Sequence, residues 1–269
     1  MKICALIATY GRPTLLANGL ACFEAQSHPD RACIIVDDSG TMGDKRFFRF
    51  ADSGRFARSW RFYYNPNRFP TLTKKYNWML AEALRQWPET KAVVIQDDDD
   101  VYGPEWLSSH AAALEGHEWS HPRQVYSLHH PPAVNGVPGL ESSTGRFWAS
   151  AAVRVSLLQR LGGFIETARP TFDQENLAAW QREGGDPGRP DDFERPQYVY
   201  GWGRSNHVSG QMGHADWYER QRPMESVAAP VKITPEMDEQ TKIIYRELWG
   251  VENPSPPAPQ AETGQRAGG

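Results

Sequence analysis

The sequence predicts an α/β fold in which a mostly parallel sheet is flanked by helices and followed by a less regular C-terminal region. Short apolar runs alternate with segments of helical spacing through the first part of the chain. Three of these runs end directly in polar or acidic residues, as strands do where an open α/β sheet carries a ligand site. Later segments are richer in glycine and proline and less periodic.

The first strand–helix–strand unit lies at the N-terminus. Residues 3–8 form an apolar run that closes in a polar loop at 9–13, which predicts a buried strand. Residues 15–25 carry apolar side chains at helical spacing, and residues 31–36 form a second buried strand that stops at two aspartates. A strand, a helix and a parallel strand in this order are the repeating unit of an open α/β sheet.

The same alternation continues along the chain. Pro88 ends one helical pattern and Pro104 stands near the start of another, because proline interrupts a helix interior but fits its first turn. We therefore predict helices over 47–56, 73–87 and 104–114, and strands over 61–64 and 92–95.

The second half is less regular. Its predicted helices cover 155–161, 172–181 and 241–249, its predicted strands cover 124–129, 146–152 and 197–200, and residues 184–196 are predicted to be a loop. We expect one domain over residues 1–250, made of an N-terminal half (1–104) and a second half (105–250). Residues 251–269 are rich in Pro, Ala and Gly, which predicts a disordered tail.

Composition restricts the classes of partner. The chain of 269 residues has a formal net charge of -4 and no long basic run, so bulk attraction to nucleic acid or anionic lipid is not indicated. Cys4, Cys22 and Cys33 show no metal-type spacing, which favours reduced, buried thiols. No apolar run is long enough to span a bilayer. We expect a soluble, cytoplasmic protein, a location compatible with peripheral attachment to a membrane.

Four consecutive aspartates, Asp97, Asp98, Asp99 and Asp100, follow the strand at 92–95. Carboxylates this close repel one another. A solvated acidic run is the alternative, but such runs seldom abut a buried β-branched strand. Mg²⁺ and Mn²⁺ prefer oxygen ligands and commonly bridge protein carboxylates to phosphates. The position therefore predicts a divalent metal that holds a diphosphate.

Polar side chains also follow the two preceding buried strands. Thr9, Tyr10 and Arg12 come after the first strand, and Asp37 and Asp38 come after the second. A parallel sheet gathers such strand ends at one edge. Taken alone, the aspartate pair fits a turn, but its place beside the other strand ends favours a site for a base and a ribose.

At these residues the chain resembles a family 2 glycosyltransferase. Four segments carry the resemblance by their order and spacing, namely residues 7–13, 35–39, 74–77 and 96–104. The resemblance covers roughly residues 3–210 and is strongest in the N-terminal half. It implies a GT-A fold, which has a Rossmann-like, mostly parallel sheet. It also implies that residues 1–104 bind the nucleotide-sugar and that 105–250 carry the catalytic and acceptor side.

The resemblance implies roles for the donor side. The loop that packs around the nucleoside matches Thr9, Tyr10 and Arg12. Asp38 matches the aspartate that contacts the base. Lys75 stands in the segment near the nucleotide, where Tyr76 replaces the arginine that the family often has.

The aspartate run matches the family's Asp-X-Asp element, with a register that is open by one position. Asp97 and Asp99 are its two aspartates, and Asp99 is the expected metal ligand. Asp98 is expected to face the ribose or the donor sugar. The implied metal is Mn²⁺ or Mg²⁺.

A candidate catalytic base lies in the second half. Residues 161–164 and 172–175 resemble the Gly-Gly-Phe segment and the acidic motif of the family, and Asp173 matches its base. Glu175 on the same helix is a rival, and a helix N-cap is the structural alternative for Asp173. Direct displacement needs a carboxylate that takes the acceptor proton and a metal that stabilises the departing diphosphate, and it inverts the anomeric carbon.

A histidine is expected near the metal. Residues 200–207 resemble a segment in which some members of the family place a histidine at the metal or the diphosphate. His207 is the expected metal ligand and His214 the alternative. Arg204 could neutralise phosphate charge.

The sequence therefore predicts a metal-dependent, inverting transfer of sugar from a nucleotide-sugar to a hydroxyl group. A UDP-sugar is the implied donor, with GDP- and dTDP-sugars open. The acceptor is open among a glycan, a lipid-linked glycan and a small molecule. Two alternatives are a sugar nucleotidyltransferase and a non-catalytic nucleotide-sugar-binding protein. The first would typically have a glycine-rich loop after the first strand, whereas residues 9–13 contain one glycine.

Overall fold

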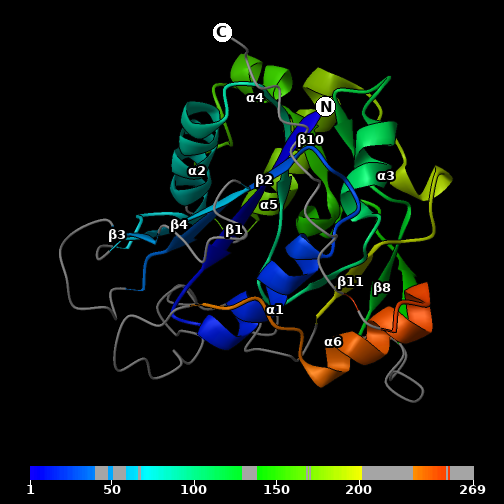
Figure 1. Cartoon of the computed structure of the whole chain (residues 1–269). Coiled ribbons are helices and arrows are strands. Elements are labelled where there is room, and N and C mark those ends of the chain that lie inside the picture. Colours follow the sequence, from blue (N-terminus) through cyan, green and yellow to red (C-terminus); the bar gives the residue numbers. More distant parts are fainter. Residues whose placement is uncertain are drawn as a thin grey trace, which may run out of the picture.

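The computed structural model of the chain contains two sheets with helices packed around them (Figure 1). It describes residues 1–39, 48–50, 59–65, 68–128, 138–167, 169, 171–201, 233–252 and 254. The larger sheet has the strand order β3-β4-β2-β1-β5-β10-β7, and the smaller one has the order β6-β11-β8-β9. The predicted α/β fold is confirmed.

Four parallel strands form the middle of the larger sheet, and they are β1 (Lys2–Thr9), β2 (Arg31–Asp37), β4 (Trp60–Tyr64) and β5 (Thr90–Ile95). Their side chains are buried along nearly their whole length, as expected for strands covered on both faces. The first two helices of the chain are α1 (Pro13–Glu24) and α2 (Leu72–Gln86). Each of these six elements lies within two residues of its predicted bounds.

The edges of this sheet are antiparallel, which the sequence did not indicate. β3 (Phe48–Phe50) pairs antiparallel with β4 at one edge. β10 (Ala152–Arg154) pairs antiparallel with β5, and β7 (Trp119–Ser120) pairs with β10 at the other edge. The helix predicted over 47–56 is wrong at β3, because the aromatic–basic–aromatic alternation there has the period of a strand. The other residues of that predicted helix lie outside the described part.

The strand predicted over 146–152 is also wrong. Phe147 has a left-handed backbone with φ of 58°, and a 3-10 turn, η1 (Trp148–Ser150), follows it. The Ser150 side chain donates a hydrogen bond of 2.7 Å to the carbonyl oxygen of Phe147, which closes the turn. The strand begins only after this turn, at β10.

The smaller sheet consists of β6 (Val101–Tyr102), β11 (Tyr198–Tyr200), β8 (Gln124–Ser127) and β9 (Gly139–Ser142). The remaining helical elements are α3 (Trp106–Ala113), α4 (Val155–Leu161), α5 (Phe172–Gly184), η2 (Pro190–Asp192), α6 (Glu239–Ile244) and the π turn η4 (Tyr245–Trp249). Gly162 ends α4 in the left-handed conformation, directly after the predicted helix at 155–161. The short turn η2 interrupts the predicted loop at 184–196.

The segment that leads into α6 lies beside α1 (Figure 1). Backbone amides of Glu236 and Asp238 donate hydrogen bonds of 3.1 Å each to the Ala17 carbonyl and the Asn18 side chain of α1. Most of the predicted tail lies outside the described residues. Within the described residues, no helix combines the length and the apolarity that a membrane span requires. All three cysteines are buried.

Two buried histidines lie between α3, β7 and η1. Nδ1 of His110 is 2.7 Å from the hydroxyl of Ser120, and Nε2 of His121 is 2.8 Å from the carbonyl oxygen of Arg146. Burial lowers the pKa of His110 to about 3 and that of His121 to about 4. Both rings are therefore neutral in the folded protein at neutral pH.

These histidines predict a loss of stability in mild acid. A histidine in an unfolded chain takes up a proton below about pH 6.5, whereas these two resist protonation until pH 3–4. Between those limits each one removes up to about 1.4 kcal/mol from the free energy of unfolding per pH unit. Burial also raises the pKa of Glu24 to about 7, and this group makes the folded state more stable as the pH falls, so the two effects oppose each other. The contribution of His121 is therefore the difference in pH dependence between the wild type and His121→Gln, measured by urea unfolding from pH 7 to pH 4. His117→Gln, which alters an exposed histidine, should show the wild-type pH dependence.

Candidate active site

The candidate site lies where β1, β2 and β5 end at the same edge of the larger sheet. The parallel register places Thr9 beside Asp37 at the ends of β1 and β2. The amide of Gln96, the first residue after β5, donates a hydrogen bond of 3.1 Å to the carbonyl oxygen of Leu6. The three loops that follow these strands therefore meet, as the sequence predicts for a parallel sheet.

Asp98 is turned into the protein and is 0% exposed. Its carboxylate accepts a hydrogen bond of 2.6 Å from the hydroxyl of Thr9 and an ion-paired hydrogen bond from Arg12. Helix α1 packs against this loop. Gly19 lies so close that a Cβ added to it would be 3.3 Å from the Cα of Asp98. That Asp98 faces the ribose or the donor sugar stays a prediction.

Arg12 joins two consecutive aspartates. One terminal nitrogen donates to Asp98, and the other is 3.0 Å from Oδ2 of Asp99. Burial alone would lower the pKa of the Arg12 guanidinium, but Asp98 and Asp99 hold that pKa above its ordinary value. Arg12 directly precedes α1, so the start of this helix is attached to the aspartate loop.

A second buried ion pair lies at the end of β2. Nζ of Lys75 is 2.6 Å from Oδ1 of Asp38 and donates a hydrogen bond of 2.7 Å to the Thr9 carbonyl. Oδ2 of Asp38 accepts from the amide of Phe69 at 3.0 Å. Asp37 shapes the adjoining loop, because its carboxylate accepts from the amides of Gly11 and Ser39. Lys75 and Asp38 thus tie α2 to the first two strand ends.

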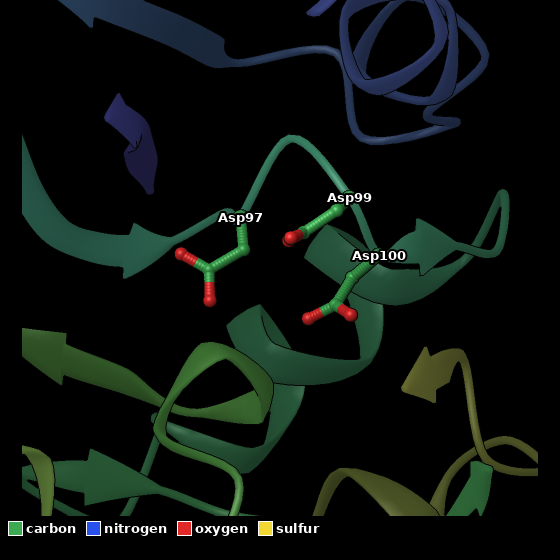
Figure 2. A group of neighbouring side chains, drawn as sticks. All are labelled: Asp97, Asp99 and Asp100. Carbon is green, nitrogen blue, oxygen red and sulfur yellow. The ribbon is translucent and has the colours of Figure 1, made fainter. Parts of the chain in front are cut away.

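Three carboxylates gather in the loop between β5 and β6 (Figure 2). Asp97, Asp99 and Asp100 each present an oxygen, and these oxygens lie within 4.8 Å of one another. Burial, together with the charges of Asp99 and Asp97, raises the pKa of Asp100 well above its ordinary value. A set of hard carboxylate oxygens at this spacing fits Mg²⁺ or Mn²⁺, whose charge would offset the repulsion.

Two of these aspartates are held by tyrosines. The Tyr198 hydroxyl donates to Asp100 at 2.5 Å, and the Gly201 amide donates to its other oxygen at 2.7 Å. The Tyr102 hydroxyl accepts from the amide of Asp97 at 2.7 Å. These contacts connect the acidic loop to both β6 and β11 of the smaller sheet.

The comparison with known proteins indicates the family. The family model described as Glycosyl transferase family 2 matches residues 4–121, which include all three strand ends and the whole acidic loop. Residues 4–121 thus match glycosyl transferase family 2, and the fold is of the GT-A type. No curated protein matches the chain.

Solved structures show the same fold as this chain. The crystal structure of S. aureus TarS 1-349 is 16% identical, with a TM-score of 0.56, and the match covers 74% of this chain and 60% of that one. TarS 1-349 in complex with UDP-GlcNAc is 17% identical, with a TM-score of 0.53 and coverage of 74% and 58%. TarS 1-349 in complex with UDP is 17% identical, with a TM-score of 0.54 and coverage of 74% and 60%. This chain thus spans less than two thirds of the length of these relatives.

An aromatic cluster links the acidic loop to α5. The Tyr76 hydroxyl lies 3.4 Å from Oδ1 of Asp97, and the Tyr76 ring packs on Trp148 with centroids 5.5 Å apart. Trp148 in turn meets Phe172, the first residue of α5, at 5.1 Å. The sequence singled out Tyr76 only as a departure from the family pattern, and nothing in the spacing indicated its contact with Asp97.

Asp173 lies in the first turn of α5 and is partly buried. Burial raises the pKa of its carboxyl group above the ordinary value. The segment before α5 is fixed at two points. The side chain of Asn77 on α2 exchanges two hydrogen bonds, of 2.9 and 2.7 Å, with the backbone of Phe164. The buried Asn176 accepts from the Ile165 amide at 2.9 Å.

The remaining expected site residues are Tyr10, which the structure describes, and His207, which it does not. Tyr10 is partly buried, and the guanidinium of Arg68 lies 4.6 Å from the centre of its ring. His207, with Arg204 and the alternative His214, lies outside the described residues. The structure therefore brings together Thr9, Arg12, Asp38, Lys75 and the aspartates.

Proposed function

We propose that this glycosyltransferase moves a sugar from a UDP-sugar to an acceptor hydroxyl, with inversion and with Mn²⁺ or Mg²⁺ bound. The observation that supports it most is the cluster of Asp97, Asp99 and Asp100 beside the buried Asp38–Lys75 pair. UDP-type donors are favoured because the similar TarS structures are described as complexes with UDP and UDP-GlcNAc. The acceptor is a glycan, a lipid-linked glycan or a small molecule.

The contacts within the acidic loop favour one register for the Asp-X-Asp element. Asp97 and Asp99 both belong to the cluster of carboxylate oxygens, whereas Asp98 binds Thr9 and Arg12 outside it. The register that we propose is therefore the alternate pair Asp97 and Asp99. We assign Asp99 to the metal and Asp97 to the metal-bound donor, and His207 stays a proposed further ligand. A divalent cation here would stabilise the negative charge of the departing diphosphate.

The nucleoside is assigned to the ends of β1 and β2. Asp38 would accept a hydrogen bond from the base, with Lys75 holding its carboxylate in place. The loop of Thr9 and Tyr10 would close around the base, with the Tyr10 ring offering an aromatic face. Thr9 contributes mainly by fixing the loop through Asp98.

Asp173 is the proposed base. It would take the proton of the acceptor hydroxyl while that oxygen attacks the anomeric carbon from the face opposite the diphosphate. Its partial burial suits this role, because a raised pKa makes a carboxylate a stronger base. The aromatic cluster of Tyr76, Trp148 and Phe172 supports α5 on the side of the acidic loop.

Thermal unfolding with nucleotide diphosphates tests the donor assignment. A ligand that binds only the folded protein raises its stability by about 2.7 kcal/mol at a concentration a hundred times its Kd. UDP with Mn²⁺ should therefore raise Tm more than GDP or dTDP with Mn²⁺, and more than UDP with EDTA. Equal shifts for all three nucleotides would contradict the preference for UDP, and no shift with any of them would contradict the nucleotide-sugar function.

A further inference from the structure

We propose that Arg12 is a positioning residue that determines which aspartates face the metal, and that it competes with the metal for Asp99. This inference rests on the proposed function, because it concerns the same metal site. It assigns Arg12 a role away from the nucleoside, although Arg12 lies in the loop that the family resemblance places there.

The geometry of Arg12 supports the first part. The planar guanidinium donates to Asp98 from one terminal nitrogen and to Asp99 from the other. Because the group is planar and rigid, it fixes the positions of the two neighbouring carboxylates relative to each other. Arg12 is 2% exposed, and its partner Asp98 is packed against α1 near Gly19. Both carboxylates are buried, but Asp99 lies within the group of carboxylates that can share an ion and Asp98 lies outside it.

The charges support the second part. Arg12 brings one positive charge to two aspartates, and its nitrogen lies 3.0 Å from an oxygen of Asp99. A divalent cation on Asp99 would lie only a few ångströms from this guanidinium. Two cations about 5 Å apart repel by about 2 kcal/mol even if the surroundings screened them as well as water does, because the metal is doubly charged. Arg12 should therefore weaken metal binding while it stabilises the metal-free fold.

Two substitutions separate charge from geometry. Arg12→Gln removes the charge, and Arg12→Lys keeps the charge but not the two-pronged geometry. Free Mn²⁺ measured by electron paramagnetic resonance gives the metal affinity without any assay of activity. We expect Arg12→Gln to bind Mn²⁺ at least about tenfold tighter than the wild type and to have a lower Tm in EDTA. Arg12→Lys should stay within about threefold of wild-type affinity.

The opposite results would overturn the competition. Unchanged or weaker Mn²⁺ binding by Arg12→Gln would show that Arg12 does not oppose the metal. If Arg12→Gln lost UDP affinity in EDTA but bound Mn²⁺ as the wild type does, Arg12 would be a nucleoside contact and not a competitor of the metal. If Arg12→Gln folds only when Mn²⁺ is present, the dependence itself supports the proposal, because the ion then replaces the missing charge.

A double-mutant cycle tests the contact with Asp98 independently of metal. Urea unfolding in EDTA of Arg12→Lys, Asp98→Asn and the double variant should show coupling of at least about fivefold in the unfolding equilibrium constant. Additive effects would overturn the positioning role. If the wild type binds no Mn²⁺, the metal part of the proposed function and the competition both fail, and the cycle alone then decides whether Arg12 positions Asp98.

Discussion

Replacement of Asp99 by asparagine is expected to weaken Mn²⁺ binding by more than about 100-fold and to abolish metal-dependent donor hydrolysis. Loss of residues that merely orient metal ligands typically costs 10–100-fold in affinity or activity, so loss of a direct carboxylate ligand should cost more. The substitution keeps the size of the side chain, and its amide oxygen can still accept from Arg12, so folding should survive. The measurements are Mn²⁺ titration and release of UDP from a UDP-sugar.

Glu89→Gln is the matched control for this prediction. Glu89 is an exposed carboxylate that directly precedes β5, at the end of the strand opposite the acidic loop. Its replacement removes the same charge without touching the proposed site, so Mn²⁺ affinity should stay at the wild-type value. Wild-type Mn²⁺ affinity in Asp99→Asn would remove Asp99 from the metal site.

Asp173→Asn is expected to lower kcat by about 10²–10⁴-fold, the range for loss of a general base. The Mn²⁺ affinity and the KM for the donor should change little, because Asp173 is assigned to the acceptor proton. Glu175→Gln alters a carboxylate on the same helical turn and is the control. A large loss of kcat in the control, with Asp173→Asn near wild type, would transfer the role of base to Glu175.

The fall in rate at acid pH should follow the protonation of the Asp173 carboxylate. A general base works only when it is ionised, and burial raises the pKa of Asp173. The rate of donor hydrolysis should therefore begin to fall at a higher pH than an ordinary aspartate, with a pKa of about 3.9, would produce. In Asp173→Asn this limb should disappear from the residual activity.

The N-terminal half of the fold could be predicted because its local signals agree with its tertiary structure. The buried strands β1, β2 and β5 are continuous apolar runs, and each ends at the residues that form the site. The edge strand β3 could not be predicted, since three residues carry too little pattern to outweigh helical spacing around them. The reversal at Phe147 depends on a backbone conformation that few non-glycine residues adopt.

The site was predicted at the level of the loops but not of each contact. Runs of polar residues after three strands correctly indicated that Thr9, Asp38 and Asp99 would lie in neighbouring loops. Sequence cannot tell which of four consecutive aspartates turns inward, because that depends on α1 packing against the loop and on the reach of Arg12. The partnership of Tyr76 with Asp97 spans 21 positions and has no local signature.

The reversed direction of β10 has a consequence for how this enzyme could diversify. Since β10 runs against β5, the turn η1 that precedes it lies at the same edge as the acidic loop, and α4 follows at the far edge. Phe172, the first residue of α5, then packs against Trp148 in η1. η1 and the start of α5 thus lie near the acidic loop without belonging to the strands β1, β2 and β5. We therefore propose that these two stretches, and not the strands of the proposed donor site, determine the acceptor preference.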